Sequence, residues 1–378
     1  MASAKTDDLE LLVIPGDGIG REVTDQACRI AEWFIGRGMR LSLRRIAFGL
    51  EVWERHGCLM TAETLAEIRA SRAILFGAIG GDAYDDIPLD IVRSQGLLRI
   101  RKELDLYANL RPVRAWPSLE PICPLVPSLA RGIDLVIVRE LADGLYYGEP
   151  RGISTDADGA RTGINTMRYS EASIRRIARA ALDIAATRSG RLTSVDKSNV
   201  LETSQLWRRV MQEEASAKPE VAVAHMLVDN CALQLMRRPG QFDVIVTENL
   251  FGDILSDEAG AIAGSLGMLP SASLRFSDEG AGRQGLYEPV HGSAPDIAGR
   301  GIANPLGAIL SLALAFRFSL DAPQAANLLE AAVEAALADG ARTIDIMHAG
   351  ARQVDCAGMG DAVLAALDAL APATRTRG

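Results

Sequence analysis

Short apolar runs alternate with helix-length segments through the first part of the chain, and this alternation most constrains the fold. An apolar run at 11–14 precedes a helical pattern over 22–35, and a run at 41–47 precedes a helical pattern over 61–70. A third apolar run follows at 73–76. Strands that alternate with helices in this way favour an α/β fold built on parallel strands.

Length and charge narrow the class of protein. A chain of 378 residues exceeds the roughly 250–300 residues at which one core stops growing, so we expect two domains. The net charge of -9 argues against nucleic acid as a partner, although arginines could still gather around an anionic substrate. The five cysteines are far apart and form no C-x-x-C pair, which predicts free thiols in a reducing compartment. No signal peptide or membrane span is visible, so we expect a cytoplasmic protein with no membrane partner.

Two glycine-rich segments follow predicted strands. The first, PGDGIG at 15–20, has the spacing G-x-G-x-G, and Arg21 departs from the Rossmann fingerprint. We therefore reject a standard Rossmann dinucleotide site here. The second, GAIGGD at 77–82, lies where open α/β sheets place their binding crevices.

Two aspartates mark the stretch at 242–273. An apolar run at 244–246 precedes a helical pattern that carries Asp253 and Asp257. Residues four apart share one helix face, and like charges there destabilise a helix by about 0.2–0.5 kcal/mol. A bound divalent cation would reverse the sign of that effect. A solvated acidic turn, which the helix dipole favours by about 0.3–1 kcal/mol, explains the spacing equally well, so the spacing alone leaves both interpretations open.

Other polar residues lie at the ends of predicted elements. Three arginines there could bind a substrate with two or three carboxylates, because the guanidinium fork matches a carboxylate. They are Arg101, Arg111 and Arg139. Lys197 ends a predicted strand and Asp229 begins a predicted helix, where a solvated lysine and a helix cap are the simpler interpretations. Tyr146 and its neighbour have the simple interpretation of packing within a strand.

Five segments, in this order, resemble the β-decarboxylating dehydrogenases of the isocitrate/isopropylmalate family. They are RKELDLYANLRP, VRELADGLYYGEPRG, VDKSNVL, FGDILSDEAG and EPVHGSAPDIAGRGIANP. The resemblance runs from about residue 9 to 371. It implies a discontinuous two-domain α/β fold with a mixed sheet and an NAD site without the Rossmann fingerprint. The NAD-binding domain would comprise 1–106 and 264–378, and 107–263 would carry dimerisation, metal and substrate binding.

The resemblance also implies the site residues and the assembly. Asp253 and Asp257 would bind Mg²⁺ or Mn²⁺, with Asp229 of the partner subunit as the third carboxylate ligand. Tyr146, Lys197 of the partner subunit and Asp229 would be catalytic. The substrate, a 3-substituted malate, would contact Ser94, Leu97, Leu98, Arg101, Arg111 and Arg139. Such enzymes are homodimers with shared active sites, and we expect an interface built by Leu255, Ala259, Ile262 and Leu266.

The implied NAD loop covers residues 291–304. Asp296 would favour NAD over NADP, because a carboxylate pairs with ribose hydroxyls and repels a 2′-phosphate. The cofactor-binding residues would be Glu288, His291, Gly292, Ser293, Ala294, Asp296, Ile297 and Asn304.

The implied reaction oxidises C2 of the malate and then removes the C3 carboxylate. Lys197 could take the hydroxyl proton directly or through Asp229. A divalent metal would stabilise the enolate oxygen by several kcal/mol, and Tyr146 would help to protonate the carbanion.

Three departures from the family pattern lie in the first domain. Ser94 stands where relatives carry a glutamate, Arg21 replaces a proline, and GGDAYDD replaces Gly-Gly-Pro-Lys-Trp. Leu97 and Leu98 suggest an apolar pocket, so we expect 3-isopropylmalate, of leucine biosynthesis, or a close 3-alkyl- or 3-arylmalate as substrate. The alternatives are isocitrate, homoisocitrate, tartrate or D-malate oxidation, and a non-catalytic regulatory subunit.

Overall fold

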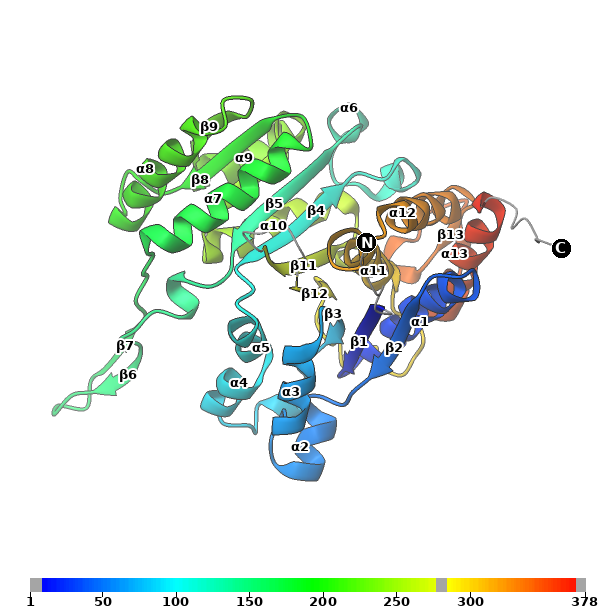
Figure 1. The fold of residues 1–378 in the computed structure, drawn as a ribbon, viewed down its shortest axis with the longest axis horizontal. Helices are drawn as coiled ribbons and strands as arrows, with labels where there is room; N and C mark the ends of the chain where they lie inside the picture. The colour runs from blue at the N-terminus through cyan, green and yellow to red at the C-terminus, as the bar shows by residue number, and fades with distance from the viewer. Residues whose placement is uncertain (1–8, 277–283, 372–378) are drawn as a thin grey trace, which may run out of the picture. The chain divides into compact units, whose positions relative to one another are not determined.

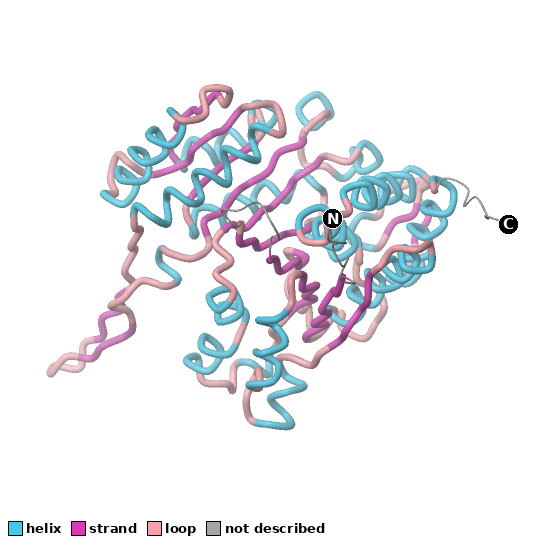
Figure 2. Tube along the Cα trace, viewed as in Figure 1, coloured by secondary structure: helices cyan, strands magenta, loops and turns pink. Residues whose placement is uncertain are grey.

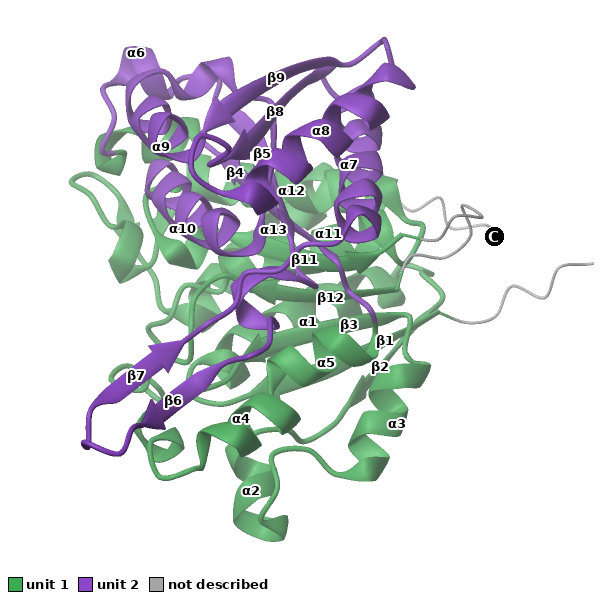
Figure 3. Cartoon of the chain, turned by 90° about the vertical axis from the view of Figure 1, so that its left-hand side faces the viewer, with its two compact units in different colours: residues 1–104, 116–123, 263–378 green, residues 105–115, 124–262 purple. Residues whose placement is uncertain are grey.

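The computed structural model describes residues 9–276 and 284–371 and divides into two compact units (Figure 3). The first unit comprises Met1–Leu104, Trp116–Cys123 and Ala263–Gly378. The second comprises Asp105–Ala115 and Pro124–Ile262. Residues Trp116–Cys123 thus pack in the first unit, although the expected boundaries place them in the second domain.

The sheet of the first unit runs in the order β2-β1-β3-β12-β11 (Figure 1). Its strands are β1 (Leu9–Gly16), β2 (Leu41–Arg45), β3 (Ala73–Ala78), β11 (Pro270–Arg275) and β12 (Gln284–Pro289). Strand β1 is parallel to β2 and β3, and β12 is parallel to β3, whereas β11 is antiparallel to β12. The predicted mixed α/β fold is therefore confirmed.

Helices cover this sheet and close the first unit. The long ones are α1 (Gly20–Gly36), α11 (Leu306–Phe318), α12 (Pro323–Ala338) and α13 (Cys356–Leu370). The shorter ones are α2 (Leu50–His56), α3 (Ala62–Ala70), α4 (Leu89–Gln95) and α5 (Leu97–Glu103). Helix α11 is buried on nearly every side, between α1, α12 and strands β11 and β12. This burial explains why its sequence is apolar all round.

The second unit has its own five strands, in the order β4-β5-β10-β8-β9. They are β4 (Ala108–Arg114), β5 (Asp134–Glu140), β8 (Arg191–Asp196), β9 (Ala222–Leu227) and β10 (Val244–Thr247). Only β4 and β5 pair antiparallel among these. The helices are α6 (Pro127–Ala130), α7 (Glu171–Ala186), α8 (Glu202–Ser216), α9 (Val228–Arg237) and α10 (Asn249–Gly260).

A hairpin extends from the second unit. It pairs β6 (Gly152–Thr155) with β7 (Arg161–Ile164) (Figure 2). Every residue of both strands is exposed, and Ile153 is 80% exposed. In the part of the chain that the structure describes, no helix has both the length and the apolar character needed to cross a membrane.

Two predictions about local structure are wrong. Tyr146 ends a 3₁₀ turn, η3 (Gly144–Tyr146), and does not lie in a strand. Of the four residues expected at a dimer interface, Leu255, Ala259 and Ile262 pack instead in the core of their own unit. The fourth, Leu266, is 48% exposed. The five cysteines are free, as predicted.

Candidate active site

Helix α10 presents the two predicted metal ligands on one face. The helix begins after Glu248, whose Oε1 accepts a hydrogen bond of 2.7 Å from the amide of Phe251. This cap fixes the helix start. Asp253 and Asp257 follow at four-residue spacing, with side chains 33% and 58% exposed.

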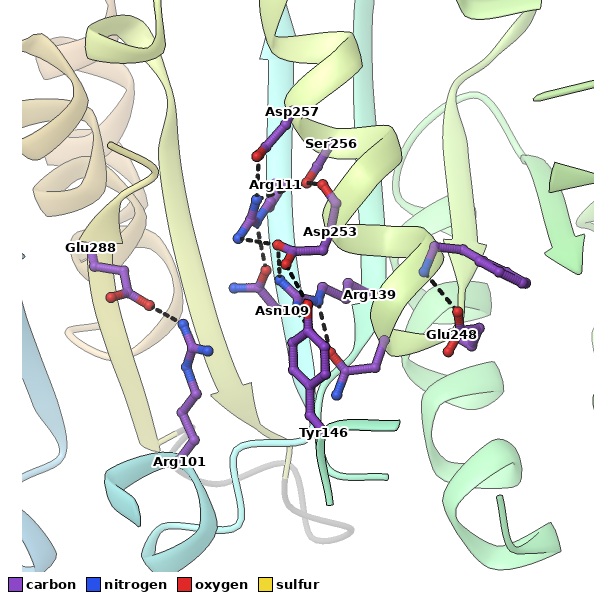
Figure 4. Close-up of polar contacts among 12 residues, drawn as sticks. Arg101, Asn109, Arg111, Arg139, Tyr146, Glu248, Asp253, Ser256, Asp257 and Glu288 are labelled. Atoms are coloured by element: carbon purple, nitrogen blue, oxygen red, sulfur yellow. Dashed lines mark hydrogen bonds and ion pairs between the residues drawn. The ribbon is translucent and has the colours of Figure 1, made fainter. Parts of the chain in front are cut away.

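Two arginines from neighbouring strands face these aspartates (Figure 4). Arg139 on β5 lies opposite Asn109 on β4, and Arg111 is two residues further along β4. Residues two apart in a strand share a face, so both arginines point the same way. Arg139 Nη1 is 2.5 Å from Asp253 Oδ1, and Arg111 Nη1 is 3.0 Å from Asp257 Oδ1.

Tyr146 joins the same group from the turn after β5. Its hydroxyl donates a hydrogen bond of 2.8 Å to Asp253 Oδ2. Its ring lies 5.5 Å from the guanidinium carbon of Arg139. Burial, and then the hydrogen bond to the Asp253 carboxylate, raise the pKa of Tyr146, so the phenol keeps its proton at neutral pH.

The donor set on α10 fits a hard divalent cation. Two carboxylates on one helix face supply oxygen ligands, which Mg²⁺ and Mn²⁺ prefer. Within residues 9–276 and 284–371, the structure does not gather three acidic, histidine or cysteine side chains that could hold a metal.

Lys197 and Asp229 form a separate pair in the second unit. Strands β8 and β9 are parallel, with Asp196 opposite Leu227, so the residues just beyond their carboxyl ends are neighbours. Lys197 Nζ lies 2.6 Å from Asp229 Oδ1. The hydrogen bond from Lys197 lowers the pKa of the Asp229 carboxyl.

The remaining predicted substrate residues lie in the first unit. Arg101 on α5 pairs with Glu288 on β12 at 2.6 Å, and both side chains are nearly buried, at 11% and 10% exposure (Figure 4). Ser94 is exposed near the end of α4, and its hydroxyl lies 3.4 Å from the carbonyl of Ile91. The adjacent leucines, 97 and 98, are half-buried at the start of α5.

The predicted NAD loop lies between β12 and α11 and rests on the PGDGIG turn. The amide of Ile19 donates to the carbonyl of Ser293 at 2.8 Å. A Cβ on Gly18 would lie only 2.1 Å from that oxygen, so only glycine fits there. This glycine turn therefore supports the loop by close packing, which differs from the phosphate cradle of a Rossmann fold.

Two side chains of this loop fit a polar cofactor. His291 Nε2 is buried without a hydrogen-bond partner, and burial lowers the pKa of the ring. The neutral imidazole therefore keeps one nitrogen available for a bound group. Asn304 is held by Asp345, whose Oδ2 accepts from its amide at 3.1 Å. Asp296 is exposed in the loop, as are Gly292 and Pro295, with Ala294 and Ile297 half-buried.

Two residues beside the aspartates were not predicted from the sequence. Asn249 accepts two hydrogen bonds from Arg139, and Gly252 gives the Arg139 stem room, because a Cβ there would lie 2.6 Å from Arg139 Cγ. The signal for Asn249 was present in the sequence. Asn249, Asp253 and Asp257 follow one another at four-residue spacing, which places all three on one face of the helix.

Solved structures show the class of protein to which this fold and site belong. An isocitrate dehydrogenase from Methylococcus capsulatus matches with a TM-score of 0.82 and 31% identity, covering 95% of this chain and 99% of that one. A β-decarboxylating dehydrogenase from Thermococcus kodakarensis matches with a TM-score of 0.75 and 36% identity, covering 96% of each chain. The class is therefore that of the β-decarboxylating dehydrogenases.

Sequence relatives narrow the class. The pattern of the isocitrate/isopropylmalate dehydrogenase family matches residues 10–363. A 3-isopropylmalate dehydrogenase from Bordetella bronchiseptica is 60% identical over 96% of this chain and 98% of its own. A 3-isopropylmalate dehydrogenase from Aquifex aeolicus is 49% identical over 96% of this chain and 98% of its own. This chain belongs to the isocitrate/isopropylmalate dehydrogenase family, as its motifs predict.

Proposed function

We propose that this enzyme oxidises and decarboxylates 3-isopropylmalate, with NAD as the oxidant and Mg²⁺ or Mn²⁺ as the metal. The observation that carries the proposal is the cluster of Arg111, Arg139, Tyr146, Asp253 and Asp257 in one unit. The names and high identity of the relatives support the choice of substrate. The free cysteines suit a reducing compartment, and we place the enzyme in the cytoplasm.

The arginines account for substrate binding. Arg111 and Arg139 carry two positive charges beside two carboxylates, and both are mostly buried, with side chains 11% and 2% exposed. Guanidinium groups in such a setting bind carboxylates strongly, because little water competes. In this proposal these arginines, with Arg101, bind the carboxylates of the malate, and Leu97 and Leu98 contact its C3 substituent.

Proton transfer is assigned to two groups. The partner's Lys197, with the partner's Asp229, takes the proton from the C2 hydroxyl, and Tyr146 returns a proton to C3 after the carboxylate has left. When bound, NAD accepts the hydride and the divalent metal supplies Lewis-acid stabilisation of the developing oxyanion. Asp253, Asp257 and the partner's Asp229 would hold the metal, and His291, Asp296 and Asn304 would contact NAD.

The proposed assembly is a homodimer whose active sites are shared. Asp229 is 63% exposed while it pairs with Lys197, so this pair is accessible to a second copy of the chain. Leu233 on α9 is 50% exposed and Ile254 on α10 is 57% exposed. Exposed apolar side chains on these two packed helices suit a protein interface.

A malate panel tests the proposal. NADH formation would be followed with Mn²⁺ and malate, 3-methylmalate, 3-isopropylmalate, 3-benzylmalate, isocitrate or tartrate. The proposal predicts the highest kcat/KM with 3-isopropylmalate. A best rate with isocitrate would move the enzyme to the other branch of the family. No turnover of any 3-substituted malate would refute the proposal.

A further inference from the structure

The side chain of Asn249, the first residue of α10, is fully buried and connects Arg139 to the chain that follows β5. Asn249 Oδ1 accepts hydrogen bonds from Arg139 Nε at 3.0 Å and from Arg139 Nη2 at 2.8 Å. Asn249 Nδ2 donates to the carbonyl of Asp143 at 3.0 Å. The oxygen and the nitrogen of this amide therefore both have partners.

The chemistry of these partners fixes the orientation of the amide. A guanidinium can only donate and a carbonyl can only accept. The amide oxygen must therefore face Arg139 and the amide nitrogen must face Asp143. If the amide were flipped, its NH₂ group would face the Arg139 N–H donors and its oxygen would face the Asp143 carbonyl. Neither pair could form a hydrogen bond, and the free-energy cost of such unpaired groups is large in a buried site.

The groups around Asn249 are themselves held. Glu140 is buried, and its two side-chain oxygens accept hydrogen bonds from the amides of Ala142 and Asp143, each at 3.0 Å. The backbone amide of Asn249 donates to the hydroxyl of Tyr169 at 2.9 Å. Glu248 already caps the helix through Phe251, so capping does not explain the Asn249 side chain.

The consequence for Arg139 follows from the planarity of its guanidinium. When Nε and Nη2 both donate to one oxygen, the plane of the group is set and Nη1 is left to point elsewhere. Nη1 faces Asp253 at 2.5 Å. We propose that Asn249 is a positioning residue that holds the Arg139 guanidinium in this plane, so that Nη1 serves Asp253 and a carboxylate of the malate. The role of the malate in this inference rests on the function proposed above.

Kinetics of a double-mutant cycle test the proposal, because a residue that acts through Arg139 should matter little once Arg139 is gone. Asn249→Ala should lower kcat/KM for 3-isopropylmalate by about 10- to 100-fold, the usual range for a lost hydrogen bond to a charged group, and leave the KM for NAD unchanged. In an Arg139→Met background the same substitution should add a loss of less than about 3-fold. Equal losses in the two backgrounds would overturn the proposal.

A buried hydrogen bond elsewhere in the unit provides the control. Ser194 is fully buried and accepts from Trp207 Nε1 at 3.1 Å. Ser194→Ala should lower the melting temperature without lowering kcat/KM for the malate. If it lowers kcat/KM as much as Asn249→Ala does, the effect is general loosening of the unit and the proposal fails. Asn249→Ser, which keeps a polar group at the helix start, replaces Asn249→Ala if that variant does not fold.

A crystal structure of the Asn249 variant separates this inference from the proposed function. The inference predicts a displaced or disordered Arg139 guanidinium, whether or not the enzyme uses 3-isopropylmalate. An unmoved guanidinium would overturn the inference even if the wild-type enzyme turns over the malate. Failure of the wild-type enzyme with every 3-substituted malate would refute the proposed function alone.

Discussion

Tyr146 and Asp253 share a hydrogen bond of 2.8 Å between the phenol oxygen and Oδ2, while the other oxygen of the same carboxylate contacts Arg139. One aspartate thus fixes both a proton donor and a cation. The raised pKa of Tyr146 keeps its proton in place. In the function proposed above, Tyr146 is the residue that returns a proton to C3 after the carboxylate has left.

The first prediction concerns the loss of the Tyr146 hydroxyl and its proton. Tyr146→Phe should lower kcat by about 100- to 10,000-fold, the range of general acid catalysis, with little change in KM for NAD. Steady-state kinetics measure both constants. The neighbouring Tyr147→Phe is the matched control and should keep wild-type kcat. An unchanged kcat in Tyr146→Phe would remove this residue from the mechanism.

The second prediction concerns the metal. Asp253→Asn keeps the side-chain shape and an oxygen for Arg139 but loses the negative charge, so the Mn²⁺ concentration for half-maximal rate should rise at least about 10-fold, a loss of roughly 1.4 kcal/mol in binding. Titration of the rate with Mn²⁺ measures this value. Asp361→Asn, which changes an exposed ion pair with Arg29, should leave it unchanged. Metal dependence unaltered by Asp253→Asn would refute the assignment.

The third prediction comes from the space beside the Arg139 stem. Gly252→Ala would put a Cβ 2.6 Å from Arg139 Cγ and 2.8 Å from Arg139 Cβ. Since both groups are buried, the overlap should destabilise the protein by about 1–3 kcal/mol and raise the KM for the malate. Gly163→Ala, where the structure leaves open space, should do neither. Urea unfolding and kinetics together give the answer, and normal values for both would contradict the packing described here.

Sharing of active sites predicts complementation between two inactive variants. Lys197→Met and Asp253→Asn should each abolish most activity as homodimers. In a mixed dimer, one site carries both changes and the other carries neither. Equal mixing after dissociation should therefore restore about a quarter of wild-type activity. An absence of recovery, with mixed dimers demonstrated by mass, would mean that each chain builds its own site.

The fifth prediction concerns pH and the buried Glu140. Burial raises the pKa of Glu140 from 4.5 to about 8. Between these values the folded chain holds a proton that the unfolded chain has released, so stability falls as pH rises through this window, by up to about 1.4 kcal/mol per pH unit. Glu140→Gln removes this loss. The unfolding free energy of Glu140→Gln, relative to that of the wild type, should therefore rise from about pH 5 to about pH 8. If the unfolding free energies of the two proteins instead change with pH in parallel, Glu140 is ionised throughout this range.

Sequence patterns predicted two kinds of element: strands whose side chains are all buried, and helices that bury only one face. The apolar runs of β1, β3 and β10 and the amphipathic helix α1 were predicted on that basis. Strands β11 and β12 were not, because serines, a glycine and a proline interrupt them. Polar side chains in these strands are buried with partners of their own, such as Ser271 on β11, whose hydroxyl donates to the carbonyl of Glu288 on β12 at 2.9 Å.

In the candidate site, too, local spacing was predicted from the sequence, whereas contacts between distant segments were not. The spacing of Asp253 and Asp257 predicted their shared helix face, but spacing could not show that Arg111 and Arg139 lie beside them. That contact depends on the antiparallel register of β4 and β5, which links residues far apart in the chain. The burial of Leu255 and Ile262 in their own unit likewise depends on packing against β5 and α9, which a helical pattern does not specify.

The stoichiometry of one reaction tests the proposed function most directly. With wild-type enzyme, Mn²⁺, NAD and 3-isopropylmalate, absorbance would give the NADH formed and a coupled assay would give the CO₂ released. One CO₂ is expected for each NADH, with 2-oxoisocaproate as the product. NADH without CO₂, or no NADH at all, would contradict the proposed function.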